Sequence, residues 1–239
     1  MGQWPPPWRK PSGDDNMPGE PLHIILYTDS KRIWEAIKSH PFVQELYRGT
    51  LPLKKYRYYV SQDYYFLVGM TRAFALLAAK TRDYGLARKA LWMAYSDATI
   101  ELENYEKHLE EIGLTLEQIL TIEPAPTTLA YVNHVLSTCS LGDPAECLVS
   151  TLPCFWTYMW LPEQLGDLIE ENKNKIYREW IETYRSKEYR QLTTYLIETI
   201  DNIGRKYSDI ERLKWIFKTS SRYEYMFWDM AYNMEKWPI

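Results

Sequence analysis

Apolar side chains recur at helical spacing along the chain from about residue 28 onward. The clearest stripe lies within residues 53–81, at intervals of three or four positions. It consists of Tyr56, Tyr59, Asp63, Phe66, Met70 and Phe74. The tyrosine and valine content of this segment favours a strand by intrinsic propensity. However, no proline interrupts it, and Gly69 costs a helix only about 1 kcal/mol. The segment is therefore predicted to form one long helix.

Residues that start or stop helices divide the remainder of the chain. Asp29 or Ser30 is expected to cap a helix that ends before Pro41, and Gly113 is expected to terminate another. Pro153 falls inside a predicted helix and must bend or break it, because proline has no backbone N–H group. The other predicted helices cover residues 84–112, 126–140, 143–171, 175–183, 186–206 and 208–236. The sequence thus predicts an all-α fold.

The first twenty residues differ from the rest in composition. Residues 1–20 contain five prolines and three glycines, a composition that does not maintain regular structure or bury a core. We therefore predict a disordered lead over residues 1–20. No internal repeat or interior linker divides the remainder, so a single all-helical domain is predicted over residues 21–239.

Composition excludes several classes of protein. The formal net charge is −4, so no basic surface for nucleic acid is implied. The longest wholly apolar run, from Phe74 to Ala79, is far too short to span a membrane. Three cysteines, an odd number, argue against a disulfide framework and predict a reducing, cytoplasmic location. Aromatic residues make up 15% of the chain, which exceeds the needs of one core and favours contacts between subunits.

Two carboxylates occupy positions where helical periodicity requires apolar side chains. Asp63 lies on the stripe described above, and Glu224 lies on a second one. That second stripe consists of Leu213, Phe217, Ser220, Glu224, Phe227, Ala231 and Met234. Burying a carboxylate is costly unless it is paired or hydrogen-bonded. These residues are therefore candidates for a functional site. The alternatives are structural carboxylates bonded to a tyrosine or to Arg222, or stripes that follow the surface.

Cys154 follows Pro153 and shares a helix face with Tyr158, four residues later. A lone buried cysteine usually serves as a small apolar residue. A proline kink, however, is typical of functional sites, which makes Cys154 a candidate nucleophile. Cys139 and Cys147 lack such a setting and are interpreted as packing residues.

The histidines form no pattern that predicts a metal site. The chain lacks the two Glu-x-x-His motifs that are typical of di-iron helical bundles. It also lacks the paired-cysteine and His-x-x-x-His spacings of zinc sites. Neither a metal nor another cofactor is therefore predicted.

Five segments, taken in order, resemble the TenA family (thiaminase II, aminopyrimidine aminohydrolase). They are HPFVQELYRGTLPLKKYRYYVSQDYYF at 40–66, PTTLAYVNH at 126–134, LPCFWTYMW at 152–160, IYREWIETY at 176–184 and TSSRYEYMFWDMAY at 219–232. One such segment is a weak match, but five in this order are specific. The resemblance covers nearly the whole chain after residue 35.

The resemblance implies an all-α, heme-oxygenase-like bundle that assembles as a homotetramer. It implies a hydrolase that converts 5-substituted 4-amino-2-methylpyrimidines to the 5-hydroxymethyl compound, a reaction of thiamin salvage, without a cofactor. The substrate is thiamin itself or the aminomethylpyrimidine left by thiamin breakdown. The sequence does not decide between these two.

The resemblance also assigns site residues. It places the family's nucleophilic cysteine at Cys154, its pyrimidine-binding aspartate at Asp63 and its catalytic glutamate at Glu224. The active-site tyrosines fall on Tyr131, Tyr158 and Tyr184. Phe66 stands where a tyrosine can occur, so stacking on a ring is kept and a phenol hydrogen bond is lost.

The chemistry of an aminopyrimidine explains why these residue types are needed. Its amino group beside a ring nitrogen matches a carboxyl group, the role given to Asp63. Protonating the ring lets the Cys154 thiolate add to a ring carbon, and Glu224 is assigned to proton transfer. Two alternatives stay open. One is an oxygenase on the same bundle, with or without metal. The other is a non-catalytic regulator that binds a pyrimidine or a partner protein.

Overall fold

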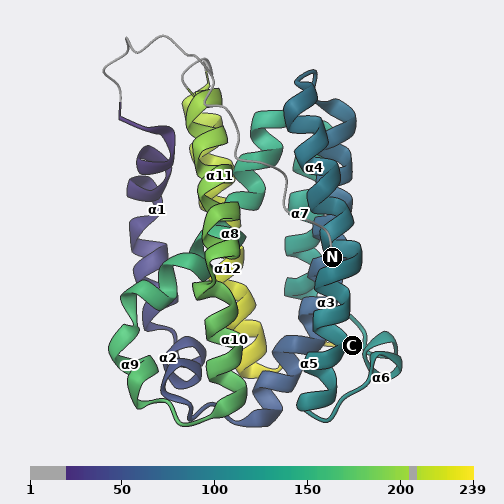
Figure 1. The fold of residues 1–239 in the computed structure, drawn as a ribbon, viewed down its shortest axis with the longest axis vertical. Coiled ribbons are helices and arrows are strands. Elements are labelled where there is room, and N and C mark those ends of the chain that lie inside the picture. Colours follow the sequence, from purple (N-terminus) through teal and green to yellow (C-terminus); the bar gives the residue numbers. More distant parts are fainter. Residues whose placement is uncertain (1–19, 205–208) are drawn as a thin grey trace.

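A computed structural model describes residues 20–204 and 209–239, and every regular element among them is a helix (Figure 1). The first half of the chain forms α1 (Leu22–Ser39), α2 (Pro41–Arg48), α3 (Leu53–Lys80), α4 (Tyr84–Ser96), the π-helical segment η1 (Asp97–Glu101), α5 (Leu102–Glu111) and α6 (Leu116–Leu120). The second half forms α7 (Pro126–Leu141), α8 (Pro144–Gln164), α9 (Gly166–Glu171), α10 (Lys175–Arg185), α11 (Lys187–Gly204) and α12 (Ile210–Asn233). The predicted all-α fold is confirmed. The lead expected at residues 1–20 lies almost entirely outside the described residues.

The long helices form a bundle with two sides (Figure 1). Helix α3 packs against α4 and α7 on one side, while α12 packs against α1 and α8 on the other. Helix α8 contacts α7, α11 and α12, so it joins the two sides. Any group on the inward face of α8 therefore faces helices from both halves of the bundle.

The long helix predicted over residues 53–81 is observed as α3. Its stripe of aromatic residues is buried, with Tyr56, Tyr59 and Phe74 at most 1% exposed. Gly69 lies where α3 passes α7, and a Cβ atom at this position would sit 2.8 Å from Cγ1 of Val132. A side chain here would push the two helices apart, which explains a glycine in mid-helix.

The predicted start of the first helix is wrong. Helix α1 begins at Leu22, so Asp29 and Ser30 lie inside it and cap nothing. Leu22 and Leu26 are buried in the core and continue the apolar face of the helix toward its N-terminus. Packing of these two leucines outweighs the preference of Asp and Ser for cap positions.

Two helices that the sequence predicts as continuous are interrupted. The predicted 84–112 helix is divided by the π-helical turn η1, although Gly113 follows its end with the predicted left-handed backbone, at φ +72°. The predicted 143–171 helix ends at Gln164, and α9 continues from Gly166. Pro162 lies in the last turn of α8, and because it has no N–H group it weakens the helix just before this end.

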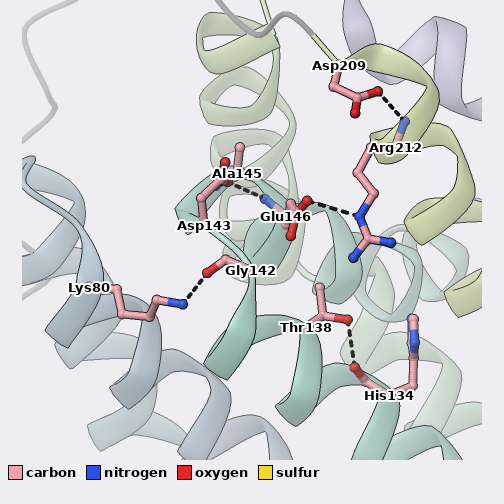
Figure 2. Close-up of polar contacts among 9 residues, drawn as sticks. All are labelled: Lys80, His134, Thr138, Gly142, Asp143, Ala145, Glu146, Asp209 and Arg212. Atoms are coloured by element: carbon pink, nitrogen blue, oxygen red, sulfur yellow. Dashed lines mark hydrogen bonds and ion pairs between the residues drawn. The ribbon is translucent and has the colours of Figure 1, made fainter.

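The turn between α7 and α8 is held from several directions, as Figure 2 shows. The Lys80 ammonium group donates hydrogen bonds to the carbonyl groups of Cys139, Ser140 and Gly142, which end α7 without helical partners. Asp143 caps α8 by accepting from the backbone N–H groups of Ala145 and Glu146. Arg212 of α12 pairs with Glu146 at 3.1 Å. These contacts set the position at which α8 enters the bundle.

Cys139 and Cys147 form a disulfide across this turn, which corrects their interpretation as packing residues. Because α7 and α8 are antiparallel neighbours joined by a short turn, the two Cα atoms lie 4.3 Å apart. Cysteine usage therefore no longer supports the predicted reducing environment. Cys154 is the remaining free thiol.

None of the helices in residues 20–204 and 209–239 combines the length and the apolar character needed to cross a membrane.

Candidate active site

A cavity opens between the two sides of the bundle, and all seven residues singled out from the sequence line it. They are Asp63, Phe66, Tyr131, Cys154, Tyr158, Tyr184 and Glu224. The empty space is about 860 Å³, including its opening to solvent. These residues come from five helices, α3, α7, α8, α10 and α12, so only the tertiary fold assembles them. Most of the remaining wall is aromatic or aliphatic, as is usual for a small-molecule pocket.

The backbone that carries Cys154 is tied to the neighbouring helices one turn earlier. The Ser220 hydroxyl group of α12 donates to the carbonyl oxygen of Ser150 at 2.8 Å. The Nε2 atom of His134, on α7, lies 3.0 Å from the hydroxyl oxygen of Ser220. Because Pro153 has no N–H group, this part of α8 lacks one backbone hydrogen bond. The hydrogen bond from Ser220 supports the helix at this position. Cys154 is half-buried, with its remaining exposure in the cavity.

Glu224 lies at the bottom of the cavity and is only 3% exposed. The Tyr131 hydroxyl group donates to its Oε1 atom at 2.5 Å, and the Thr157 hydroxyl group donates to Oε2 at 3.4 Å. Burial raises the pKa of Glu224 to about 7, although these two hydrogen bonds favour the ionised form. The negative charge of Asp63 adds to the increase. Glu224 can therefore both accept and release a proton near neutral pH.

The buried Glu224 is expected to lower the stability of the fold at alkaline pH. Between about pH 4.5 and 7 the folded chain holds a proton at this position that the unfolded chain has lost. The free energy of unfolding therefore falls as the pH rises through this window. At pH 8 the loss is about 3 kcal/mol, at 1.36 kcal/mol per pKa unit. Thermal unfolding of Glu224→Gln should show a higher midpoint than wild type at pH 8 and an equal one near pH 4.

Glu45→Gln is the matched control for this measurement. The hydroxyl group of Tyr232 donates to Glu45 at 2.9 Å, so this residue is also a glutamate bonded to a tyrosine, but it lies outside the cavity. A Glu45→Gln variant should show no comparable pH-dependent gain. An equal midpoint for Glu224→Gln and wild type at pH 8 would contradict the burial of a charged carboxylate.

The pKa of the Cys154 thiol is raised well above its ordinary value. Burial is the largest cause, and the negative charges of Glu224, Asp63 and Asp97 follow. The thiol is therefore protonated at neutral pH when the cavity holds no ligand. Glu224 contributes to this electrostatic effect and titrates near pH 7, so it is suited to take the thiol proton.

Aromatic rings form the remaining walls. Phe66 packs against Tyr131 with ring centroids 4.7 Å apart, and Tyr158 packs against Tyr184 at the same distance. The hydroxyl groups of Tyr158 and Tyr59 lie 2.9 Å apart. Burial raises the pKa of both of these tyrosines, and the negative charge of Asp63 adds to the increase. The cavity thus offers flat apolar faces with carboxyl and hydroxyl groups at their edges, an arrangement that fits a polar heteroaromatic ring.

Sequence reasoning missed Asp97, which also lines the cavity. The sequence contains a sign of its inward position, because Asp97 continues the helical spacing of Leu86, Ala90 and Met93. These three residues are buried on one face of α4. Residues 84–112 were predicted as one continuous helix, and Asp97 was not considered there as a site residue. Phe155, Tyr189 and Phe227 also line the cavity without having been singled out for it.

Within the part of the chain that the structure describes, no group of three or more His, Cys, Asp or Glu side chains is placed to share a metal ion.

Known proteins resemble this chain over most of its length. The sequence profile described as the TENA/THI-4/PQQC family matches residues 27–234. An aminopyrimidine aminohydrolase from Halalkalibacterium halodurans is 34% identical over 214 residues, which cover 89% of this chain and 96% of the relative. An aminopyrimidine aminohydrolase from Bacillus subtilis is 32% identical over 206 residues, or 85% of this chain and 86% of the relative.

Among solved structures, a TenA homologue from P. horikoshii OT3 superposes with a TM-score of 0.87 at 42% identity and covers 90% of this chain and 99% of its own. The profile match and the curated relatives each extend over most of the chain, and the five segments that suggested the family contain the seven predicted residues that line the cavity. The chain belongs to the TENA/THI-4/PQQC family.

Proposed function

We propose that this chain is a hydrolase that converts 5-substituted 4-amino-2-methylpyrimidines to 4-amino-5-hydroxymethyl-2-methylpyrimidine, as a step of thiamin salvage. One observation carries the proposal. A free thiol, a buried carboxyl group with a pKa near 7 and an aspartate face one aromatic-walled cavity. The relatives named aminopyrimidine aminohydrolase support the reaction class.

Asp63 is proposed to anchor the pyrimidine. The exocyclic amino group donates a hydrogen bond to one carboxylate oxygen, and a protonated ring nitrogen donates to the other. The ring then lies between aromatic faces, with Phe66 among them. Protonation of the ring makes it electrophilic, and the carboxylate stabilises the resulting positive charge.

Cys154 is proposed to be the nucleophile and Glu224 the group that moves its proton. As the thiol proton passes to Glu224, sulfur forms a bond to the unsubstituted ring carbon next to C5. The ring electrons then expel the leaving group from the 5-methylene carbon, and water adds to that carbon. Loss of the cysteine sulfur restores aromaticity. The balance is one water consumed, with ammonia or the thiazole released.

A direct assay tests this proposal. Purified protein is incubated with aminomethylpyrimidine and, separately, with thiamin, and the hydroxymethyl product is measured. We expect product from at least one of them. Binding of either compound without turnover would contradict a hydrolase and favour a pyrimidine-binding regulator. Stoichiometric iron in the purified protein would instead favour an oxygenase.

We further propose that the chain assembles as a homotetramer in the cytoplasm. Tyr84, Leu91 and Tyr95 are 83%, 58% and 66% exposed, and their spacing places them on one face of α4. A face of this composition is typical of contacts between subunits. Light scattering at micromolar concentration should give four times the mass of one chain, and a monomer would contradict the proposal. The cytoplasmic location stays a prediction, because the disulfide removes cysteine usage as its support.

A further inference from the structure

The charged side chains that line the cavity are all acidic. They are Asp63, Asp97 and Glu224, and within the described residues no lysine, arginine or histidine lines it. Three carboxyl groups that line one cavity favour a ligand that carries positive charge. A pyrimidine with a protonated 5-aminomethyl group is such a ligand, whereas its hydroxymethyl product is neutral at the same position.

Two of the three carboxyl groups have other tasks in the proposed reaction. Glu224 accepts from Tyr131 and Thr157 and exchanges protons with Cys154. Asp63 is needed at the amino edge of the ring. Asp97 is assigned no part in holding the ring or moving the thiol proton, yet it lies in the same cavity.

The position of Asp97 on its helix directs it toward the interior of the bundle. Its position continues the buried face of α4, after Met93, and it is the first residue of the π-helical turn η1. Such turns change the direction of side chains and occur frequently at functional sites. Asp97 lies in the cavity wall.

Asp97 and Cys154 line the same cavity. Burial is the largest cause of the raised pKa of the Cys154 thiol, and the negative charge of Asp97 is among the charges that add to it. In the proposed chemistry, sulfur adds to the ring carbon next to C5, and the leaving group hangs from the methylene carbon on C5. A carboxylate in the wall of the same cavity can therefore face the leaving group.

We propose that Asp97 binds the positively charged 5-substituent of the substrate and thereby selects pyrimidines whose leaving group is an ammonium group. The inference rests on the proposed function. The ammonium nitrogen keeps its three protons while bound to Asp97. When the C–N bond breaks, both bonding electrons go to nitrogen, which departs as ammonia. A neutral amine would have to leave as the far more basic amide ion, so a carboxylate that favours the protonated form helps both binding and departure.

Asp97→Asn tests the proposal, because it keeps the shape of the side chain and removes its charge. A charge-assisted hydrogen bond of this kind contributes about 10- to 100-fold in affinity. We expect kcat/KM for aminomethylpyrimidine to fall by about that factor, while the affinity for the neutral hydroxymethyl product changes less than about twofold. Asp167→Asn, at an exposed position of α9 outside the cavity, is the control for the change in net charge and should behave as wild type.

Binding to a Cys154→Ser background separates this inference from the proposed reaction. Calorimetry would compare aminomethylpyrimidine with hydroxymethylpyrimidine, with and without Asp97→Asn. Loss of the preference for the ammonium compound would support the role of Asp97 even if the wild-type chain proved to hydrolyse neither substrate. Equal losses for both compounds, or no loss for either, would overturn it.

Discussion

Replacing Cys154 by serine is expected to lower the turnover of aminomethylpyrimidine by about 10³-fold or more, because serine presents a hydroxyl group where the reaction needs a thiolate. The surroundings of residue 154 make it difficult to ionise any side chain at this position. Burial and three nearby carboxyl groups already raise the pKa of the thiol, and the hydroxyl group of serine is a far weaker acid. Steady-state kinetics of product formation measure the loss. The variant should still fold, because exchanging sulfur for oxygen leaves little empty space.

Alkylation provides an independent check of Cys154. Cys139 and Cys147 are joined in a disulfide, so iodoacetamide should label Cys154 alone, and the loss of activity should follow that label. Because the pKa of the thiol is raised, labelling should be slow at neutral pH and faster in alkaline solution. Bound hydroxymethylpyrimidine should protect the thiol. A serine variant with a near wild-type rate would eliminate the covalent mechanism.

Glu224→Gln is expected to lower kcat by about 10²- to 10⁴-fold, the usual contribution of a general acid or base. The amide keeps the size of the side chain, and its oxygen still accepts a hydrogen bond from Tyr131. However, the amide group neither gains nor loses a proton near neutral pH. The affinity for substrate should change much less, since a proton-transfer group acts mainly in the transition state. Rates and product affinity, measured on the same preparations, separate these effects.

Glu45→Gln serves again as the control for Glu224, and it should retain wild-type kinetics. Equal losses of binding and turnover in Glu224→Gln would make Glu224 an anchor for the ring rather than a proton-transfer group. For wild type, the activity should decline on one side of pH 7 as Glu224 changes its protonation state, and Glu224→Gln should lack that limb.

The anomalous polar residues could be found from the sequence, because helical periodicity is local. Asp63 and Glu224 stand out on apolar stripes, and Cys154 stands out beside a proline inside a helix. Periodicity shows that such a residue faces inward, but it does not show which residues of other helices surround its side chain. The structure adds that all three reach one cavity.

Several features depended on contacts between distant parts of the chain. The start of α1 was missed because packing of Leu22 and Leu26 outweighed cap preferences. The spacing after Met93 indicates that Asp97 faces inward, but its place in the cavity wall depends on the π-helical turn and on the packing of α4 on α3. The disulfide was missed because only the close approach of α7 and α8 brings Cys139 and Cys147 together.

The sequence by itself determined the helical class, most helix positions and the three polar candidates Asp63, Cys154 and Glu224, since each depends on spacing within a single segment. The tertiary structure decided the ionisation of those side chains. The pKa of Glu224 near 7 and the raised pKa of Cys154 come from burial and from charges on other helices. Desolvation depends on everything that surrounds a group, so it is set only when the helices pack together.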